Sequence, residues 1–413
     1  MLTLPTNRDE NWRYANLRPL AKARPEAVEI SAVAALDLPP SLPGHERWVF
    51  IDGRLSRAAS SPAPDTRAEL LDARAAGDAF AAMLDSEIAA HGVDFALARA
   101  NAARGDEVLH IELPQSQEHG AAPARIELVF VATAPAAAGT SYPRVQVHAG
   151  RDTHLCLVER HISPGTSLPA NDSANNPAIN AAVDLALAAG ARVEHSRLQN
   201  CAAGASCFDT LVAHVAERAS YKLRTVVVGA LTSRSTVFIK LAGRGATCEL
   251  DAASVAGGIQ THDMFAEIEH VAPETRTREL YRGLATDRGK LAFNGKMIVR
   301  ESAHGADSDQ SLKTLLTGNG AEAAIRPQLE IHTDRVRAVH GATTGKLDDA
   351  MLFYLLSRGV DRPTAQTLLQ WAFIEDAVSR VGPAELRSET ELLIEARLTE
   401  VAALGLLAGA VKP

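Results

Sequence analysis

The feature that most constrains this chain is a long series of short segments in which apolar and polar residues alternate, from about residue 107 to about residue 345. Residues 125–131, 144–148 and 155–159 each alternate with a period of two, which is typical of a strand that buries one face. Helix-length amphipathic segments are scarce in this stretch. The region is therefore predicted to consist mainly of β-strands.

The strand openings recur at a nearly constant interval. A small residue followed by alternation occurs at Gly190, Ala219 and Gly245, and a related opening occurs at Glu274, giving spacings of 29, 26 and 29 residues. Repeats of this length are typical of solenoids, in which each coil buries its inward residues by stacking on its neighbours. Regularly spaced short strands also occur in β-sandwiches. The periodicity alone favours a β-solenoid and a sandwich about equally.

The two ends of the chain have a different pattern. Residues 1–110 are predicted to form a mainly helical domain, because residues 65–104 are rich in Ala, Leu, Glu and Arg with a broken helical periodicity. Residues 111–346 are the predicted β core, and residues 347–413 a C-terminal helical domain. In that last domain Asp348 and Asp361 are expected helix N-caps. Its apolar surface is explained equally well by self-packing and by the docking of a partner.

Composition and charge exclude several classes of function. The chain has 42 Lys and Arg against 50 Asp and Glu, a net charge of −8, which argues against nucleic acid and anionic membranes as partners. The first 14 residues carry charges where a signal peptide needs an apolar segment. The longest apolar run, residues 402–411, is shorter than the roughly 20 residues that span a bilayer. We therefore expect a cytoplasmic protein.

The cysteines and the glycine-rich loops give no clear chemical motif. The four cysteines form no CxxC pair and are expected to be reduced, small, buried or half-buried side chains rather than metal ligands. They are Cys156, Cys201, Cys207 and Cys248. The loops ending at Lys290 and Lys346 lack the spacing and the hydroxyl residue of a Walker A motif. Any ATP-driven step would need another subunit.

Two pairs of histidines could contribute metal ligands. His262 and His270 flank acidic residues, and are interpreted as residues on the surface of a strand rather than as a metal site. His332 and His340 flank Asp334 with the same separation of eight residues. His340 precedes Gly341, so it is expected at the end of a strand, which is a usual place for a functional side chain.

Several segments resemble, in order and spacing, the motifs of the SufB/SufD family of bacterial iron–sulfur cluster assembly scaffolds, and among them those of SufD. The similar segments are residues 11–14 (NWRY), 293–295 (FNG), 311–316 (SLKTLL), 326–331 (RPQLEI), 340–345 (HGATTG) and 352–359 (LFYLLSRG). The strong similarity covers about residues 255–375, and as a set these motifs are specific.

The resemblance implies a mainly β fold with helical ends, in which a right-handed parallel β-helix is flanked by N-terminal and C-terminal helical domains. It implies a non-catalytic scaffold subunit of a complex with the paralogous scaffold SufB and the ABC-type ATPase SufC. It further implies that the complex handles transient iron or a nascent iron–sulfur cluster, with no cofactor bound stably by this chain alone.

The resemblance also assigns residues. Its motif histidine matches His340, which the resemblance makes a candidate metal ligand in a site that would be shared with SufB. The expected SufC-docking residues lie in the C-terminal domain: Phe353, Tyr354, Leu356, Arg358 and Trp371. The expected SufB-pairing residues lie in the last strands: Glu330, Val336 and Val339. Many family members have Cys two positions before the histidine, where this chain has Ala338, so thiolate ligation there is excluded.

Two other functions are compatible with parts of the sequence. A homodimeric metal-delivery or metal-storage protein is permitted by the His, Asp and Glu content, with an exposed terminal strand that could pair with a second copy. A β-helix carbohydrate-active enzyme is disfavoured, because such enzymes usually need sugar-stacking aromatic residues and only 4% of this chain is aromatic.

Overall fold

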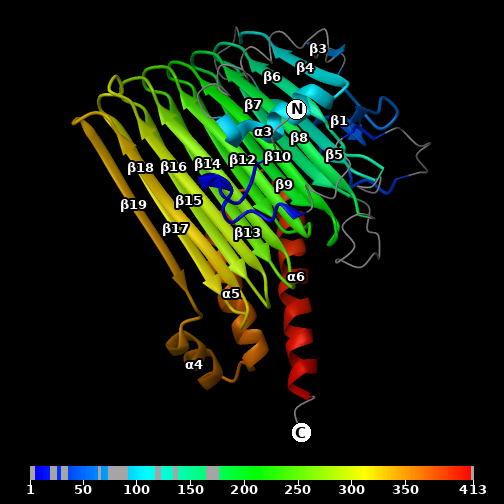
Figure 1. Cartoon of the computed structure of the whole chain (residues 1–413), viewed down its shortest axis with the longest axis vertical. Helices are drawn as coiled ribbons and strands as arrows, with labels where there is room; N and C mark the ends of the chain where they lie inside the picture. The colour runs from blue at the N-terminus through cyan, green and yellow to red at the C-terminus, as the bar shows by residue number, and fades with distance from the viewer. Residues whose placement is uncertain are drawn as a thin grey trace.

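The computed structural model describes residues 5–18, 26–28, 36–63, 67–72, 92–116, 122–133, 138–163 and 176–410. Its dominant feature is a pair of long sheets between which the chain passes back and forth (Figure 1). The strands are β1 (Glu46–Ile51), β2 (Arg54–Leu55), β3 (Arg67–Asp72), β4 (Glu107–Leu113), β5 (Ala124–Val131), β6 (Arg144–Ala149), β7 (His154–Ile162), β8 (Ala178–Leu187), β9 (Arg192–Asn200), β10 (Ser206–Val215), β11 (Ser220–Val227), β12 (Thr232–Leu241), β13 (Thr247–Ala256), β14 (Thr261–His270), β15 (Arg276–Ala285), β16 (Lys290–Val299), β17 (Ala306–Leu316), β18 (Glu322–Ile331) and β19 (Val336–Gly345).

Successive strands join different sheets. The odd sheet has the order β19-β17-β15-β13-β11-β9-β7-β5-β1-β2, and the even sheet has the order β18-β16-β14-β12-β10-β8-β6-β4-β3. From β4 to β19 each strand pairs in parallel with the strand two places further along the chain. This parallel pairing is that of a β-solenoid and excludes the antiparallel sandwich. The predicted β-solenoid is therefore confirmed.

The register explains the repeat in the sequence. Residues that pair with one another on successive odd strands are separated by 28, 27 and 29 positions, as seen for Arg192, Ser220, Thr247 and Arg276. Such paired residues share one rung of the ladder. A turn with a left-handed residue precedes several of these strands, as at Gly245, whose φ is +68°. One coil of the solenoid therefore corresponds to one sequence repeat.

Alternate residues of every strand point into the solenoid and stack in columns. The main apolar cluster consists of these inward residues, largely Val, Leu, Ile and Ala. Neighbouring strands lie about 4.8 Å apart, so identical positions on successive coils are in contact. Each coil therefore packs mainly against the coils before and after it, as expected for a repeat protein.

A group of charged side chains lies inside the solenoid at β7, β9 and β10. The guanidinium of Arg197 lies 2.9 Å from Glu159 and 2.6 Å from Asp209, and all three side chains are buried. His195 Nε2 lies 3.2 Å from Glu159, which also contacts His161. Burial alone would raise the pKa of Glu159, but Arg197 and His161 hold that pKa well below its usual range. We call these five side chains the buried charge cluster. Arg197 and Glu159 remain ionised because their opposite charges compensate each other.

The N-terminal segments cover the outer face of the even sheet (Figure 1). The short 3₁₀ helices η1 (Glu10–Trp12) and η2 (Gly92–Phe95) and the helix α3 (Ala96–Arg104) lie here. The Trp12 ring is fully buried under the Arg234 guanidinium, 4.1 Å from the ring centre. The predicted aromatic arm thus packs on the solenoid.

The prediction of a mainly helical N-terminal domain needs correction, because β1, β2 and β3 all lie within residues 1–110. Leu70 and Leu71, which were assigned to a helical pattern, lie in β3, where they pair with β4 in an antiparallel arrangement. β3 is only six residues long and its two leucines are adjacent, so the sequence shows no clear period of two there. Nearly half of the segment for which helix was predicted, residues 73–91, lies outside the described residues.

Three helices follow β19: α4 (Asp349–Ser357), α5 (Arg362–Val378) and α6 (Ala384–Ala410). Asp348 accepts hydrogen bonds from the backbone N–H groups of Ala350 and Met351, and Asp361 accepts one from Thr364, as predicted for N-caps. α5 packs on the outer face of the odd sheet, whereas α4 projects beyond it (Figure 1). Among the described helices, none combines the length and the apolar character needed to cross a bilayer.

Candidate partner-binding and metal-binding surfaces

The solenoid is open at the end formed by its last coil. β18 and β19 are the terminal strands of their sheets, and within the described residues no further strand pairs with them. Each therefore presents one unpaired backbone edge, which can accept a strand from another protein. Ile331 and Val339 leave 42% and 50% of their surface exposed at this end. The open end combines free backbone groups with exposed apolar side chains.

The structure places the three predicted strand-pairing residues at this open end. Val339 is exposed on β19, and Val336 is half-buried against Val299 and its neighbours. Glu330 is the penultimate residue of β18, and its carboxylate lies 2.9 Å from His332 Nε2 and 3.4 Å from Lys296 Nζ. The hydrogen bond from His332 is the main cause that lowers the pKa of Glu330. The three residues share one end of the solenoid, although Glu330 is already paired within the chain.

His340 lies in the middle of β19, and the expectation that it ends a strand is wrong. β19 continues through Gly341 to Gly345 because each residue keeps its parallel partner on β17. Gly341 has no left-handed backbone conformation and follows the extended strand. The side chain of His340 is exposed.

The rung partners of His340 show which way its column faces. Leu250, Glu279, Gln310 and His340 occupy the same position on β13, β15, β17 and β19. Leu250, Glu279 and Gln310 are buried inside the solenoid, and the Gln310 amide donates to the carbonyl of Gly295 on the opposite sheet at 3.0 Å. His340 is thus the last member of an inward-facing column. It is exposed only because no further coil covers it.

A polar pair lies directly behind His340 in this column. The Gln310 amide also donates to the Glu279 carboxyl, and burial raises the pKa of Glu279 to about 7. Within the described part of the chain, His340 belongs to no group of three or more potential metal ligands. It can therefore supply one ligand, and a metal ion at this position needs further ligands from another molecule.

The raised pKa of Glu279 predicts a pH-dependent stability. Because the folded state holds the proton more tightly, the contribution of Glu279 is present below its unfolded pKa of about 4.5 and is lost as pH rises through about 7. Glu279→Gln is expected to remove this loss, which amounts to about 3 kcal/mol for a fully buried group. The measurement is the free energy of unfolding in urea at several pH values between 4 and 8.

A matched control uses the exposed carboxylate of Glu322, which lies on β18 with Lys290 as its partner. Glu322→Gln is expected to keep the pH slope of the native chain, whereas Glu279→Gln flattens it. The comparison uses the slope of the free energy of unfolding against pH. A loss of packing that is the same at every pH lowers the stability but does not change this slope. Equal slopes in native chain and Glu279→Gln would contradict the assignment.

The remaining histidines differ from their interpretation as surface residues. His262 is 2% exposed and His270 is fully buried. His270 hydrogen-bonds through its two nitrogens to the hydroxyls of Thr275 and Thr277, at 2.8 and 3.0 Å. Burial lowers the pKa of each histidine to about 4, so both are neutral core residues. Their even separation indicated one strand face, but not which face.

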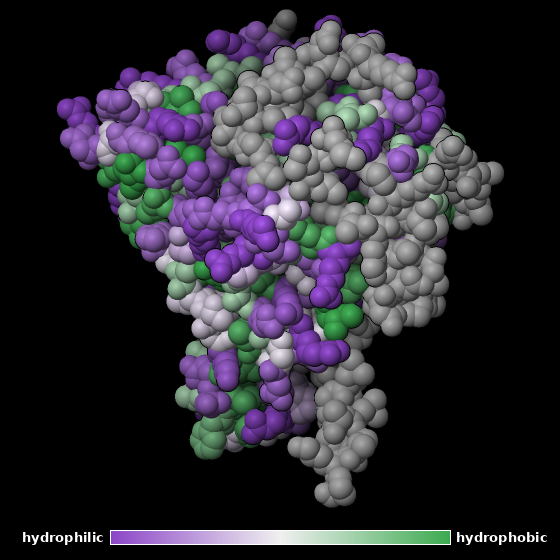
Figure 2. All heavy atoms as spheres, viewed as in Figure 1, coloured by the Kyte–Doolittle hydropathy of each residue, from purple (hydrophilic) through white to green (hydrophobic). Residues whose placement is uncertain are grey.

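α4 presents an exposed apolar surface. Phe353 and Tyr354 are 71% and 56% exposed, Met351 is 59% exposed, and only Leu352 among its residues is buried. Arg358 is exposed with its guanidinium 5.1 Å from the Tyr354 ring centre, and Leu356 is half-buried. Figure 2 shows green, hydrophobic atoms at the end of the molecule that α4 and α5 occupy. We call the exposed side chains of Met351, Phe353 and Tyr354 the α4 surface.

Trp371 has a different environment from the other predicted docking residues. It lies on α5, half-buried against the apolar cluster that joins α5 and α6 to the outer face of the odd sheet. That cluster includes Ile374, Val378 and Leu386 from the helices. The self-packing explanation is therefore confirmed for α5 and α6, which pack on the solenoid, whereas the apolar side chains of α4 remain exposed.

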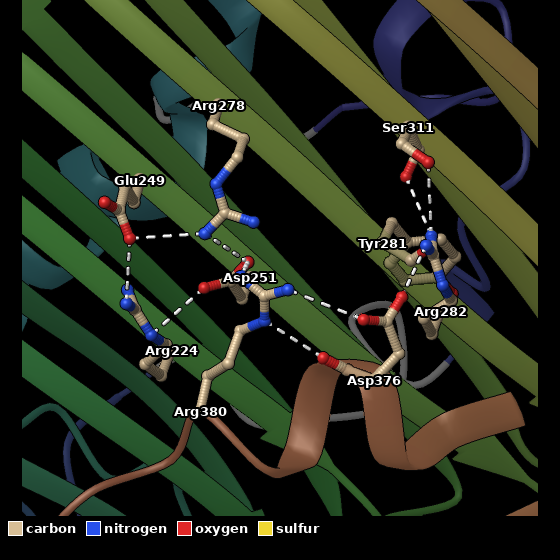
Figure 3. Close-up of polar contacts among 9 residues, drawn as sticks. All are labelled: Arg224, Glu249, Asp251, Arg278, Tyr281, Arg282, Ser311, Asp376 and Arg380. Carbon is tan, nitrogen blue, oxygen red and sulfur yellow. Dashed lines mark hydrogen bonds and ion pairs between the residues drawn. The ribbon is translucent and has the colours of Figure 1, made fainter. Parts of the chain in front are cut away.

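An ion-pair network fixes α5 to the odd sheet (Figure 3). Asp251 on β13 is buried, with Arg224 at 3.0 Å, Arg278 at 3.3 Å and Arg380, just after α5, at 3.9 Å. Burial raises the pKa of Asp251, and the three arginines oppose this rise. The carboxylate is thus the shared partner of cations from two coils and the helical domain.

A second contact continues this network along α5. Arg282 on β15 lies 2.7 Å from Asp376 and also donates to the carbonyls of Tyr281 and Ser311 (Figure 3). A guanidinium that bridges strands and helix has less freedom than an exposed one. The C-terminal domain is therefore firmly connected to β13, β15 and β17, whose order leads to the open end.

One group of potential metal ligands was missed in the sequence. His154 and Cys156 on β7 and Glu194 on β9 have ligand atoms that all lie within 4.8 Å of one another, on the outer face of the odd sheet. The His-x-Cys spacing places two ligands on one strand face. The third ligand is 38 residues away and follows only from the register. The other three cysteines are buried, as expected.

Comparison with known proteins agrees with the motifs. Residues 130–373 match the family model of the SufBD core domain, described as belonging to SUF-system iron–sulfur cluster assembly. The chain is 26% identical to the iron–sulfur cluster assembly protein SufD of Escherichia coli K12 over 96% of this chain and 89% of that protein. It is 23% identical to a SufBD family protein of Synechocystis sp. PCC 6803 over 96% of this chain and 88% of that protein.

A plant protein is similar over a shorter region. The chain is 28% identical to the chloroplastic protein ABCI7 of Arabidopsis thaliana over 51% of this chain and 44% of that protein. The family match covers more than half of the chain and runs from the end of β5 into α5, so that it includes β6 to α4 in full. Together with the β-solenoid, these findings establish that the chain belongs to the SufBD family of iron–sulfur cluster assembly proteins and is SufD-like.

Proposed function

We propose that this chain is a scaffold subunit that acts in the cytoplasm in a complex with SufB and SufC. The observation that carries the proposal is the open end of the solenoid, where no other strand of the described part of the chain pairs with the outer edges of β18 and β19, and apolar side chains are exposed beside them. A soluble solenoid normally has a covered end, because exposed edges and inward-facing residues favour association. The open end is therefore best explained as a surface for another subunit.

SufB fits this surface because it is a paralogous scaffold of the same family. Two solenoids that meet end to end can continue each other's sheets by strand pairing, with Val339 and Ile331 in the contact. The inward column that ends in His340 would then face the interior of the partner solenoid. His340 would be one ligand for iron or a nascent cluster, and SufB would supply the others, since Ala338 offers no thiolate.

The α4 surface is proposed to bind SufC. Its phenyl and phenol rings are exposed, its N-terminus is capped by Asp348, and α5 behind it is held by the Asp251 network. Exposed aromatic residues on a rigid element are typical binding hot spots. A force applied at α4 would reach β13 and β15 through Arg380 and Arg282. ATP hydrolysis is assigned to SufC, and this chain is proposed to have no turnover of its own.

The experiment compares native chain with His340→Ala in a complex reconstituted with SufB and SufC. We expect assembly to be unchanged, because the side chain of His340 is exposed and makes no hydrogen bond to the described residues. Cluster formation, followed by the visible absorption of the iron–sulfur chromophore, is expected to fall at least about tenfold when a ligand is lost. Loss of assembly would assign His340 a structural role instead.

A homodimer is the second candidate, and the same open end favours it. A second copy of this chain could pair along β19 in the absence of SufB. Such a dimer would bring two His340 side chains together and could hold metal for delivery. If SufB displaces the second copy, the homodimer is the resting form of the scaffold rather than a separate function.

A further inference from the structure

A group of three different metal-ligating side chains lies far from the open end, on the outer face of the odd sheet. His154 and Cys156 are two residues apart on β7, and Glu194 is the direct rung partner of Cys156 on β9. The imidazole, thiol and carboxylate converge with all ligand atoms within 4.8 Å of one another. His154 and Cys156 are half-buried and Glu194 is exposed, so solvent and ions reach the group.

We propose that His154, Cys156 and Glu194 form a binding site for a single divalent transition-metal ion, with Zn²⁺ as the best-matched ion. Nitrogen, sulfur and carboxylate oxygen are the three ligand types that Zn²⁺ accepts together. A fourth position is open to solvent. This proposal concerns β7 and β9 and does not depend on any role of His340 or of the open end.

The dimensions of the site fit this coordination. Zinc bonds to sulfur at about 2.3 Å and to nitrogen or oxygen at about 2.0 Å, so the ligand atoms of a tetrahedral site lie about 3.3–3.8 Å apart. The three ligand atoms lie within 4.8 Å of one another. Side-chain rotations that move each atom by about 1 Å would therefore bring them to the distances of a tetrahedral site. The backbone does not need to move, because the ladder between β7 and β9 already sets the positions.

The charge of the site balances when a metal ion binds. The Cys156 thiol gives up its proton to solvent, and the resulting thiolate and the Glu194 carboxylate neutralise the two charges of the ion while the imidazole stays neutral. Burial and Glu194 raise the pKa of the Cys156 thiol, so the ion itself must drive this ionisation. Within the described residues neither His154 nor Cys156 has a competing hydrogen-bond partner.

Cations next to the site oppose binding and set its affinity. Lys222 Nζ lies 3.7 Å from Glu194, and Arg125 is the rung partner of Cys156 on β5. Solvent partly screens the charges of both cations, because the Lys222 side chain is 38% exposed and Arg125 is also exposed. They disfavour a bare dication but not the neutral complex formed after thiol deprotonation. Hard cations such as Mg²⁺, which need several oxygen ligands, are excluded.

Two of the three proposed ligands, Cys156 and Glu194, line a cavity. The cavity has a volume of about 200 Å³ and is lined by Cys156 and Glu194 together with Arg380, Gly382 and Pro383. These last residues form the link between α5 and α6. A water molecule or a small ligand bound to the metal ion would therefore contact the attachment of the C-terminal domain.

The test uses the full chain, stripped of metal with a chelator and titrated with Co²⁺ as a spectroscopic substitute for Zn²⁺. We expect one equivalent of Co²⁺ to produce a near-ultraviolet thiolate-to-cobalt charge-transfer band, which excess Zn²⁺ abolishes. Cys156→Ser, a nearly isosteric change at a half-buried position, is expected to remove the band. His154→Ala and Glu194→Gln are expected to weaken binding at least about tenfold.

The matched control is another half-buried histidine that contacts a carboxylate without a thiol. His148 Nδ1 lies 2.8 Å from Glu112, and His148→Ala is expected to bind Co²⁺ as the native chain does. A native chain without the band would overturn the proposal. So would a band that persists in Cys156→Ser, or affinities in His154→Ala and Glu194→Gln equal to that of the native chain. Near-ultraviolet circular dichroism verifies that each variant is folded.

Discussion

Arg197→Met is expected to lower the free energy of unfolding by about 3–5 kcal/mol. The substitution fills a similar volume but leaves Glu159 and Asp209 buried without the guanidinium that lies 2.9 and 2.6 Å from them. Glu159 is fully buried, so solvent cannot replace the lost charge. The measurement is urea-induced unfolding followed by far-ultraviolet circular dichroism.

Arg192 on the same strand provides the matched control, because its side chain is exposed. Arg192→Met is expected to change the stability by less than about 0.5 kcal/mol, as is usual for a surface substitution. Equal losses for the two variants would mean that β9 itself, rather than the buried charge cluster, is sensitive to substitution. A loss below about 1 kcal/mol for Arg197→Met would contradict the ionised state assigned to the cluster.

Phe353→Glu is expected to weaken the binding of SufC by about 30-fold or more, which corresponds to about 2 kcal/mol. Phe353 is 71% exposed in the isolated chain, so the substitution removes little internal packing. In a complex it would place a carboxylate in a desolvated apolar contact. Titration calorimetry with purified SufC gives the dissociation constant directly.

Leu392→Glu on α6 controls for a charge added to another exposed apolar residue, since Leu392 is 66% exposed. We expect Leu392→Glu to bind SufC with native affinity. If Phe353→Glu also binds normally while remaining folded, the α4 surface is not the docking site. Equal weakening by both variants would point to net charge rather than to a local contact.

The strands and their repeat were predictable from the sequence, because each strand has its own alternation of apolar and polar residues. A period of two within strands, and a period near 28 between them, both derive from local contacts that one coil makes with the next. What the sequence could not supply was parallel pairing, since the same alternation suits a sandwich. The prediction of parallel pairing came from the family motifs, which lie mainly in the C-terminal half of the core.

The errors in the site prediction have one physical cause. An alternating strand shows that residues share a face, but not whether that face is inward or outward. His262 and His270 were therefore placed on the surface, although their stacking neighbours put them in the core. His340 was placed at a strand end because Gly341 was taken as a break, whereas β17 holds the backbone extended through both residues.

The three potential metal ligands at Cys156 show that a site can also be missed when its residues come from different strands. His154 and Cys156 could be paired by their spacing, but Glu194 becomes their neighbour only through the register of β7 and β9. A one-residue shift in that register would move Glu194 to the opposite face of its strand. Sequence reasoning without the register had no means to join the three.

The central claim is that the open end formed by β18 and β19 pairs with SufB. The most direct test is size-exclusion chromatography with light scattering, applied to the native chain alone and to an equimolar mixture with SufB and SufC. The account predicts that the mixture gives one species whose mass includes all three proteins. A native chain that keeps the same mass, alone and in the mixture, would contradict it.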